Sequence, residues 1–284
     1  TTFDDSALIG KDSNGAVSAA IRNASLSEGH IRYGLNLNGM TSYLRYPSGI
    51  MDGVNEMTVS IAYKWNGPSS TVGKQKLFDF STKTSSVSSP SSYMYLDMGD
   101  GTSGMTVTVS DGKNKTIVDT GVKTTGEWLR ATVTIKNGVI RIYMNGEEKA
   151  KSSTNVNLAS MHPNFCYIGK SGTKGDPLFY GIVDEIYISH QAITKEQAQR
   201  LSSEGVAAAG AFSGEDENGD FSWDQILNRI LIVGVCILVV LIGAVIGIIA
   251  VNLYRKRKAE PKVPQNGKHR FETGEKNSRK QKRE

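Results

Sequence analysis

Apolar and polar residues alternate over short runs from the N-terminus to about residue 203. In residues 56–65, EMTVSIAYKW, every second side chain is a large apolar one, and residues 129–136, LRATVTIK, have the same period. Successive side chains of a β-strand point to opposite faces of the sheet, so a period of two predicts strands with one buried face. Asn137-Gly138 joins the second run to residues 139–144, VIRIYM. An Asn-Gly pair between alternating runs predicts a tight hairpin.

Further short runs have the composition of strands, and turn-forming residues separate them. Roughly ten strands without a long helix between them predict an all-β fold, an antiparallel β-sandwich or jelly roll, over residues 1–203. One helix signal closes this domain, because Thr194 and Gln197 form a capping-box pattern before AQRL. The further strand-like runs are residues 43–46, 76–80, 93–98, 105–109, 164–169 and 181–188.

A different pattern begins near residue 229. Residues 230–251 form a run of 22 residues without a charged side chain. A helix of this length is about 33 Å long, and the hydrocarbon core of a bilayer is about 30 Å thick. The alternative, a buried core helix, seldom has so many consecutive apolar positions. We therefore predict one transmembrane helix over residues 229–254, joined to the domain by a stalk over residues 204–228.

The two flanks of this predicted helix differ in charge. The N-terminal flank, GEDENGDFSWDQILNR, is acidic, and its Trp223 is expected to lie at the level of the lipid headgroups. On the other flank, Tyr254 is followed directly by basic residues. An excess of Lys and Arg marks the cytoplasmic side of a membrane, which predicts an outer N-terminal domain and an inner C-terminus. The basic residues after Tyr254 are Arg255, Lys256, Arg257 and Lys258.

The tail over residues 255–284 holds 12 basic and 4 acidic residues and few large apolar ones. Such a composition predicts disorder and attraction to the anionic lipid of the inner leaflet. The tail acts either as part of a stop-transfer anchor or as a docking segment for a partner. Gly243 and Gly247 form a GxxxG pattern, which favours close packing of two helices and hence a homo- or hetero-oligomer.

Charge and cysteine content narrow the class of protein. The net charge of +5 arises from the tail, since residues 1–228 hold 20 basic and 24 acidic residues. Nucleic-acid binding by the folded domain is therefore not expected. The chain has two cysteines, in dissimilar segments and without zinc-ligand spacing, so we expect neither a disulfide framework nor a zinc site. Scarce cysteine and abundant Lys, Asn and Ser suit the surface of a Gram-positive bacterium.

The motif YGIVDEIYIS contains two adjacent carboxylates, Asp184 and Glu185. Strand geometry predicts that they point to opposite sides of the sheet. Asp184 shares its predicted face with Ile182, Ile186 and Ile188, which form the better candidate for the core, and Glu185 is then expected on the solvent side. A carboxylate that faces a core needs a partner, either hydrogen-bond donors, a basic side chain or a cation.

The order of segments TFDD, GLNLNGMTSYLRYP, MTVSIAYKW, GEWLRATVTI, IRIYMNGEE and YGIVDEIYISHQAIT resembles the LamG-like jelly roll of the concanavalin A-like lectin/glucanase superfamily. Trp128, Tyr143 with Gly146, and Asp184-Glu185 match motifs of its consecutive late strands. The family's usual aromatic-His pair after the Trp is here Leu129-Arg130, at a position that is not catalytic. The resemblance covers residues 1 to about 203.

The same resemblance implies a structural Ca²⁺ held by the late-motif aspartate together with oxygens from the N-terminal segment. Asp184 is the late-motif aspartate, and Asp4, Asp12 and Asn14 match the positions of the N-terminal oxygen ligands. Oxygen ligands of this kind are the ones that Ca²⁺ prefers. Hydrogen bonds to Asp184 without a cation remain the alternative.

Catalysis is not expected. Glucanases of the superfamily carry a Glu-x-Asp-x-x-Glu strand, which is absent here. Carboxylates on opposite sides of a sheet cannot flank a glycosidic bond at the separation of about 5–9.5 Å that glycoside hydrolysis requires. No Ser/His/Asp or Cys/His arrangement is evident among the four histidines, which lie in predicted loops, strand ends or the tail.

The chain is thus expected to be a single-pass surface protein with a non-catalytic binding domain for carbohydrate or a cell-surface ligand. We expect exposed aromatic side chains to bind the carbohydrate by stacking on its sugar rings. For each of these side chains, packing in the core is the alternative. An adhesion module or subunit of a membrane complex is a second possibility. Because the sequence begins with Thr1, the domain is either a mature form or the anchoring accessory end of a larger surface glycosidase. The aromatic candidates are Trp65, Tyr93, Tyr95 and Tyr180.

Overall fold

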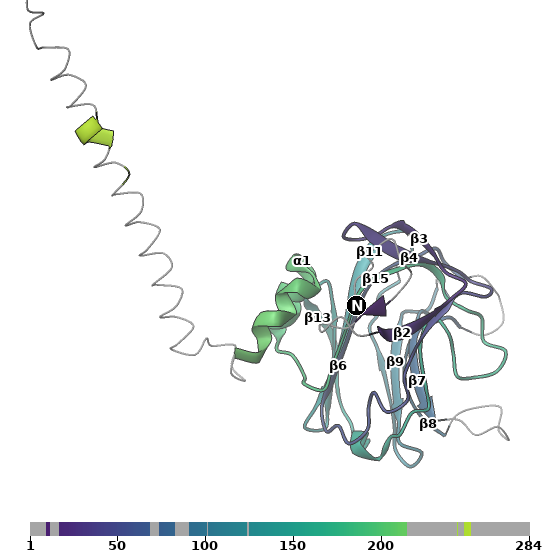
Figure 1. The fold of residues 1–284 in the computed structure, drawn as a ribbon. Helices are drawn as coiled ribbons and strands as arrows, with labels where there is room; N and C mark the ends of the chain where they lie inside the picture. The colour runs from purple at the N-terminus through teal and green to yellow at the C-terminus, as the bar shows by residue number, and fades with distance from the viewer. Residues whose placement is uncertain are drawn as a thin grey trace, which may run out of the picture. The chain divides into compact units, whose positions relative to one another are not determined.

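The computed structural model contains two β-sheets packed face to face (Figure 1). Neighbouring strands in both sheets run antiparallel. The predicted all-β sandwich is therefore confirmed. The residues that the structure describes are 10–11, 17–68, 74–82, 91–100, 102–123, 125–214, 243 and 247–250.

The first sheet has eight strands in the described residues, and strand β14 lies in its middle, between β5 and β7. This insertion joins segments that are far apart in the sequence. In spatial order the strands are β1 (Gly10–Lys11), β2 (Val17–Arg22), β5 (Tyr43–Tyr46), β14 (Phe165–Ile168), β7 (Lys76–Thr82), β8 (Ser92–Asp97), β9 (Thr106–Ser110) and β10 (Lys115–Asp119).

The second sheet has seven strands in the described part of the chain, with β6 and β15 at its centre. Asn137 and Gly138 both have positive φ angles, of 50° and 70°, which confirms the tight hairpin predicted between β11 and β12. In spatial order the strands are β13 (Glu147–Ser153), β12 (Val139–Met144), β11 (Trp128–Lys136), β6 (Met57–Trp65), β15 (Tyr180–Ser189), β4 (Tyr33–Asn38) and β3 (Ser25–Glu28).

The core lies between the two sheets. Every second residue of β6, from Met57 to Trp65, belongs to it, as the alternating pattern predicted. Trp65 is 1% exposed, and its Nε1 donates a hydrogen bond to Gln75 Oε1 at 2.6 Å. Trp65 is therefore a core residue, and its assignment as a ligand-binding residue was wrong.

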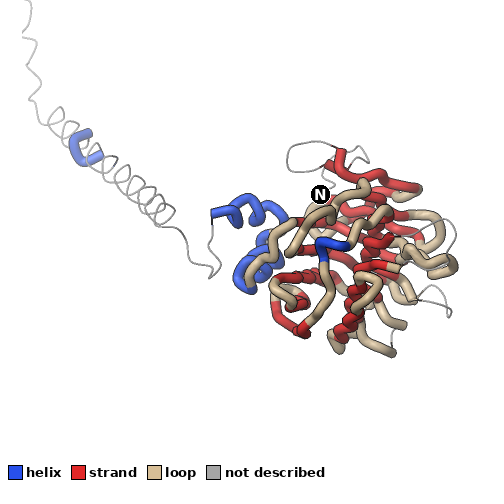
Figure 2. Tube along the Cα trace, turned by 90° about the horizontal axis from the view of Figure 1, so that it is seen from below, coloured by secondary structure: helices blue, strands red, loops and turns tan. Residues whose placement is uncertain are grey.

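A helical layer covers part of the outer face of the seven-stranded sheet (Figure 2). Helix α1 (Lys195–Glu204) begins with the predicted capping box at Thr194, and a 3₁₀ segment, η2 (Val206–Gly214), follows it. A shorter 3₁₀ turn, η1 (Leu158–Ser160), precedes β14. Phe212 of η2 packs with Leu201 of α1 in a small second core, so the packed chain extends beyond the predicted boundary at residue 203.

A β-bulge in β15 breaks the alternation of its side chains. Asp184 pairs with Ala62, and the next paired residue, Tyr187, is opposite Ser60, so that two residues of β15 face a single residue of β6. Glu185 within the bulge has a φ of +52°, in the left-handed region. The regular geometry that predicted opposite sides for Asp184 and Glu185 therefore does not hold.

The bulge places both carboxylates on the outer face of the seven-stranded sheet. Val183 before the bulge and Ile186 after it belong to the core, whereas Asp184 lies in one cross-strand row with Ala62 and Arg130. The expected core-side position of Asp184 beside Ile182, Ile186 and Ile188 was wrong. The expected solvent-side position of Glu185 was also wrong, because Glu185 is 4% exposed.

Most of the predicted transmembrane segment over residues 229–254 lies outside the described residues, as do most of the stalk and the whole tail. Within the segment, Gly243 and residues 247–250 are described and are helical. The described part of the chain contains no helix that is both long and apolar enough to cross a bilayer. Outside the described residues also lie Trp223, Tyr254, Arg255, Lys256, Arg257 and Lys258.

Candidate functional site

Aromatic side chains gather on the outer face of the eight-stranded sheet. Tyr93 and Tyr95 of β8 stack on each other, with ring centroids 5.3 Å apart and ring planes at 17°. Phe165 and Tyr167 of β14 form a similar stack, at 5.6 Å and 21°. The two stacks occupy neighbouring positions of one sheet, since only β7 separates β8 from β14. We call these four residues the aromatic face.

Two small polar residues of β7, Asp79 and Ser81, lie between the two stacks. Tyr167 and Tyr95 pair with Asp79 from either side, and Phe165 and Tyr93 pair in the same way with Ser81. Both polar residues are 1% exposed. We call Asp79 and Ser81 the floor pair of the aromatic face.

Cationic side chains lie over the rings. Lys170 Nζ is 4.2 Å from the ring centroid of Tyr43 and 4.9 Å from that of Tyr167, and Lys76 Nζ is 4.4 Å from that of Tyr95. Arg45 lies 5.5 Å from the ring centroid of Phe165. Cation–π contacts of this kind hold the rings in fixed positions.

Three aspartates surround the ammonium group of Lys76. Its Nζ is 2.7 Å from Asp97 Oδ2 and 4.0 Å from Asp176 Oδ2. Burial raises the pKa of Asp79, while a hydrogen bond from the Gly172 N–H, the nearby Ser81 and the charge of Lys76 act against this shift. The edge of the aromatic face is therefore a cluster of three carboxyl groups around one ammonium group.

The connection between β14 and β15 crosses the floor pair. The Gly172 N–H donates to Asp79 Oδ2 at 2.9 Å, and the Ser171 hydroxyl donates to Asp176 Oδ2 at 2.8 Å. A cavity of about 340 Å³ lies between this connection and the stack of β14. Its lining includes Phe165, Tyr167 and Lys170. This volume is of the order needed for a small ligand.

The structure brings together two of the four aromatic residues that were predicted to bind ligand. Tyr93 and Tyr95 lie on the aromatic face, whereas Tyr180 begins β15 of the other sheet and is 41% exposed there. Phe165 and Tyr167 were missed, although their positions on either side of Cys166 in NFCYIG are the signal of a shared strand face.

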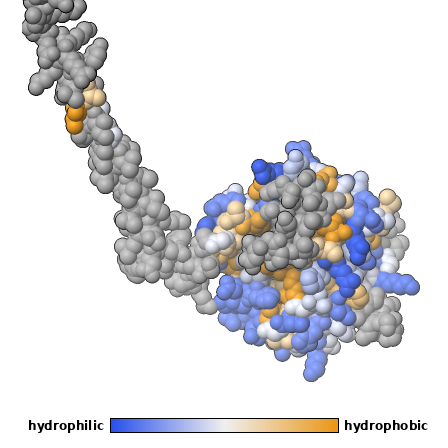
Figure 3. Space-filling view, viewed as in Figure 1, coloured by the Kyte–Doolittle hydropathy of each residue, from blue (hydrophilic) through white to orange (hydrophobic). Residues whose placement is uncertain are grey.

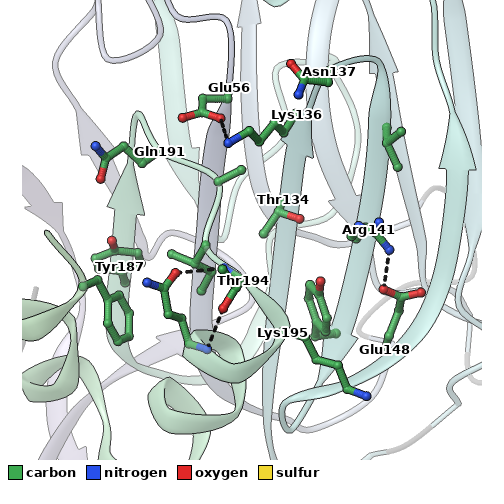
Figure 4. A pocket seen from close by; sticks show the side chains of 16 residues that line it. Glu56, Thr134, Lys136, Asn137, Arg141, Glu148, Tyr187, Gln191, Thr194 and Lys195 are labelled. Atoms are coloured by element: carbon green, nitrogen blue, oxygen red, sulfur yellow. Dashed lines mark hydrogen bonds and ion pairs between the residues drawn. The ribbon is translucent and has the colours of Figure 1, made fainter. Parts of the chain in front are cut away.

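A second and larger cavity, of about 630 Å³, lies between the start of α1 and strands β11 to β13 (Figure 4). Two ion pairs lie on either side of Thr134: Lys136 with Glu56 at 3.2 Å and Arg141 with Glu148 at 2.8 Å. Its charged groups therefore largely satisfy one another. No pair of stacked rings lines it among the described residues, which makes the aromatic face the stronger candidate site.

Asp184, the predicted calcium ligand, accepts hydrogen bonds through both of its carboxylate oxygens. Its Oδ2 accepts a hydrogen bond from the Ile31 N–H at 3.0 Å, and its Oδ1 accepts one from the Glu185 N–H at 2.7 Å. Within the described residues no three His, Cys, Asp or Glu side chains are grouped as metal ligands. Each of these N–H groups uses one lone pair of a carboxylate oxygen, and a Ca²⁺ at Asp184 would need further oxygen ligands. The other predicted ligands, Asp4, Asp12 and Asn14, lie outside the described residues.

Glu185, the second carboxylate of the motif, binds the start of η2, directly after α1. Glu185 Oε2 accepts a hydrogen bond from the Val206 N–H and lies 3.6 Å from Arg130 Nη2. Arg130 Nη1 donates to the Glu185 carbonyl oxygen at 3.0 Å. Burial raises the pKa of Asp184 to about 6, against the effect of its N–H donors. These residues therefore form a buried structural cluster.

The domain's surface is mostly polar in the view of Figure 3, with smaller apolar areas between the polar ones. Among the described residues, large apolar side chains with more than half of their surface exposed include Met40, Ile117, Ile248 and Ile249. The last two belong to the helical residues 247–250, beside Gly247 of the predicted helix-packing motif.

Together, the two-sheet sandwich and the ordered late motifs define the class of the protein. The chain belongs to the concanavalin A-like lectin/glucanases superfamily, whose family model matches residues 38–199. No curated protein matches the chain in sequence.

Solved structures share the fold at low sequence identity. Domain 4 of AbnA, a GH43 extracellular arabinanase from Geobacillus stearothermophilus solved in complex with arabinotriose, is 24% identical with a TM-score of 0.57, and the match covers 71% of this chain and 96% of that one. The binding domain of Paraclostridial Mosquitocidal Protein 1 is 13% identical, with a TM-score of 0.53 and coverage of 68% and 49%.

The binding domain of Botulinum neurotoxin DC, in complex with rat synaptotagmin II, is 12% identical, with a TM-score of 0.54 and coverage of 72% and 50%. This chain thus spans about half the length of the two toxin chains. At these identities the likeness establishes the fold.

Proposed function

We propose that this chain is a non-catalytic carbohydrate-binding protein of the cell surface, and that the aromatic face is its binding site. The observation that carries the proposal is the pair of ring stacks, Tyr93 with Tyr95 and Phe165 with Tyr167, on either side of the floor pair. Fixed aromatic rings beside a few convergent polar groups are typical of small-ligand sites.

The chemistry of this face suits saccharides. Aromatic rings offer apolar, electron-rich faces against which the C–H groups of a sugar ring pack. The carboxylate of Asp176 and the hydroxyl of Ser171, which line the cavity beside the stack of β14, are hydrogen-bonding partners for sugar hydroxyls. The arabinotriose complex of the AbnA domain is a precedent for a saccharide ligand in a domain of this fold.

The hydrogen bonds, ion pairs and burial of the carboxylates favour a binding role over catalysis. Asp97 is held by Lys76 at 2.7 Å, and Asp79 is buried beneath Gly172. Asp184 and Glu185 are committed to backbone N–H groups on the other sheet. A glycosidase needs two carboxyl groups that face one sugar bond, and these described carboxylates have structural partners instead.

A protein ligand is the second candidate, because the binding domain of Botulinum neurotoxin DC, which has the same fold, was solved in complex with synaptotagmin II. Cations over the rings, such as Lys170 and Arg45, would then meet an acidic peptide. A third candidate is that the domain is the accessory end of a larger surface glycosidase, for which the AbnA domain is a precedent. This third candidate requires a catalytic domain in the encoded sequence before Thr1, so reading that sequence tests it.

The proposal includes a single membrane span over residues 229–254, with the domain outside and the basic tail inside. The apolar run over residues 230–251 and the charge of its two flanks support this topology. Protease treatment of intact cells should remove the domain and leave a tail epitope protected. Release of the whole chain by high salt alone would contradict a span. Packing through Gly243 and Gly247, contact of the tail with anionic lipid, and a Gram-positive surface belong to the same proposal.

The experiment that tests the binding proposal is a glycan array probed with the full chain in mild detergent, with arabinotriose among the printed oligosaccharides. Selective binding, lost in the Tyr93→Ala, Tyr95→Ala double variant, is the expected result. Absence of binding across the array, together with capture of one surface protein, would favour the adhesion candidate.

A further inference from the structure

Lys170 holds a positive charge in a fixed place on the wall of the cavity of about 340 Å³ beside β14. Its Nζ lies 4.2 Å from the ring centroid of Tyr43 and 4.9 Å from that of Tyr167, and the planes of these two rings are at 88° to each other. The ammonium group therefore lies in the corner between two perpendicular rings, each of which attracts it. A lysine held in this way loses less side-chain entropy when a ligand binds to it.

The ammonium group of Lys170 has unused hydrogen-bonding capacity. An ammonium group has three N–H donors and no acceptor. Its contacts with described residues are the two ring contacts, and no hydrogen bond or ion pair of the described chain includes it. An aromatic ring has no net charge, so the rings position the ammonium group without neutralising it. Lys170 therefore brings an uncompensated charge and N–H donors to the cavity wall.

Two further cations lie around the same end of the aromatic face. Lys174 is exposed, lines the cavity with Lys170 and forms no ion pair with a described residue. Arg45 of β5 is exposed and pairs in register with Tyr167, on the side of β14 that faces away from β7. Its guanidinium group lies over the Phe165 ring, and it too has no ion-pair partner in the described part of the chain.

The carboxylate that lines the cavity, Asp176, does not balance these charges. Its Oδ2 accepts a hydrogen bond from the Ser171 hydroxyl at 2.8 Å and lies 4.0 Å from Lys76 Nζ, so a different cation is its partner. The domain as a whole is acidic, since residues 1–228 hold 20 basic and 24 acidic residues. A locally positive cavity on a domain of negative net charge favours anionic ligands.

We infer that the saccharide bound at the aromatic face carries an acidic group, namely a carboxylate, sulfate or phosphate, and that Lys170 binds this group by a charge-assisted hydrogen bond. This inference rests on the proposed carbohydrate-binding function and names the chemical class of its ligand. Phe165 and Tyr167 contact the sugar ring, while Lys170 and Lys174 meet its acidic substituent. Neutral saccharides bind less tightly, because they shield the ammonium group from water without giving it an anionic partner.

The class of ligand is tested on a glycan array probed with the full chain in mild detergent. Each acidic saccharide is printed beside its neutral counterpart: oligogalacturonates with their methyl esters, and sulfated and phosphorylated oligosaccharides with the unmodified ones. The acidic member of the best-bound pair should bind about ten- to a hundredfold more tightly, the effect of one hydrogen bond to a charged group. This preference should decrease as the salt concentration rises. The three kinds of pair distinguish carboxylate, sulfate and phosphate.

The role of Lys170 is tested by Lys170→Met, with Lys115→Met as the matched control. Lys115 is an exposed residue on the same face of the same sheet, in one cross-strand row with Tyr93, but it lies on β10, four strands from β14. Four strand spacings are about 19 Å, well beyond the screening length of about 8 Å at physiological salt. Both variants therefore lose the same charge from the same sheet face, but only one loses it at the cavity.

Binding of the best pair to these variants is measured by calorimetric titration. Lys170→Met should lose most of the ten- to a hundredfold preference for the acidic member and keep its affinity for the neutral one, because methionine retains an apolar side chain against the two rings. Lys115→Met should change neither affinity. Lys170→Arg retains the charge and should lose much less of the preference than Lys170→Met.

A purely structural role for Lys170 gives a different result. If Lys170 only held the rings in place, Lys170→Met would weaken binding of the acidic and neutral members equally, and this would overturn the inference. Tightest binding of a neutral saccharide would overturn it as well, and either result leaves the proposed binding function intact. Binding of oligoglutamate as tight as that of any acidic saccharide would overturn it in favour of an acidic peptide. If no saccharide of the array binds, the proposed function itself fails.

Discussion

Asp184 and Glu185 are neighbours in the sequence and lie on the same face of the seven-stranded sheet. The bulge at Glu185 turns its side chain toward Arg130, which lies in the same cross-strand row as Asp184. Asp184 accepts the Ile31 N–H, and Glu185 accepts the Val206 N–H. One irregularity of a central strand thus ties an early loop and the segment after α1 to the same sheet.

Replacement of Arg130 by methionine should destabilise the domain strongly. Arg130 is 2% exposed and is the cation beside both carboxylates, so its loss leaves buried negative charge without compensation. The expected decrease in the free energy of unfolding is about 3–5 kcal/mol, measured by urea denaturation. Arg22→Met, at an exposed position of β2, is the control and should change little. The additional substitution Glu185→Gln should restore part of the loss, and failure to do so would show that the two residues are not coupled.

Acidification should stabilise the fold through Asp184. Its pKa is about 6 in the fold and 3.8 without the fold's influence. Between these values the folded chain binds a proton that the unfolded chain does not, so stability rises as pH falls through 6 and levels off near 4. The full effect is about 3 kcal/mol.

His30 acts in the opposite direction. Burial and Arg130 lower its pKa below 6.5, so His30 costs stability as the pH falls. The measurement is therefore made by urea denaturation in a His30→Gln background, with and without Asp184→Asn. Equal pH dependence of the two variants would exclude Asp184 as the titrating group.

The sequence predicted the sheets better than the site. Alternation in β6 and the Asn137-Gly138 turn are local signals, and both correspond to what the fold contains. The bulge has no such signal, because Glu185 adopts a left-handed φ that few residues other than glycine favour. An alternating pattern predicts two faces but does not tell which face is covered. Trp65 and Tyr95 are therefore indistinguishable by pattern, although one lies in the core and the other outside it.

The assembly of the aromatic face also depends on pairing between distant segments. Phe165 and Tyr167 meet Tyr93 and Tyr95 only because β14 inserts between β5 and β7. The hydrophobic period within a strand carries no information about which strand will be its neighbour. The candidate site could therefore be predicted in part, as two tyrosines on one strand, and its other half required the fold.

Phe212 should contribute to stability although it lies beyond the last strand and helix of the predicted domain. It is 6% exposed and packs on Tyr187 with ring centroids 6.2 Å apart. Phe212→Ala should lower the free energy of unfolding by about 3 kcal/mol, measured by thermal and urea denaturation. Ile117→Ala, at a side chain that is 58% exposed, is the control and should have almost no effect. Equal effects would mean that η2 does not pack on the domain in solution.

Removal of divalent cations should leave the melting temperature unchanged. Both carboxylate oxygens of Asp184 accept N–H donors, which is the arrangement expected if hydrogen bonds without a cation satisfy this carboxylate. Differential scanning fluorimetry with excess EDTA, and again with excess Ca²⁺, checks this. A ligand that binds only the folded state raises its stability. An increase in melting temperature with Ca²⁺ that EDTA reverses would therefore restore the calcium hypothesis, with ligands from the N-terminal segment.

Tyr95 and Tyr180 provide the sharpest test of where saccharide binds. Both tyrosines are partly exposed, but Tyr95 lies in a ring stack of the eight-stranded sheet and Tyr180, at 41% exposure, begins a strand of the other sheet. Removal of a ring that contacts sugar should cost about 1–2 kcal/mol, or roughly tenfold in affinity. We expect this loss in Tyr95→Ala and none in Tyr180→Ala, by calorimetric titration with the oligosaccharide that binds most strongly on the array. Matching melting temperatures would exclude unfolding as the cause. The reverse pattern would move the binding site to the seven-stranded sheet, because only there does Tyr180 contact a ligand.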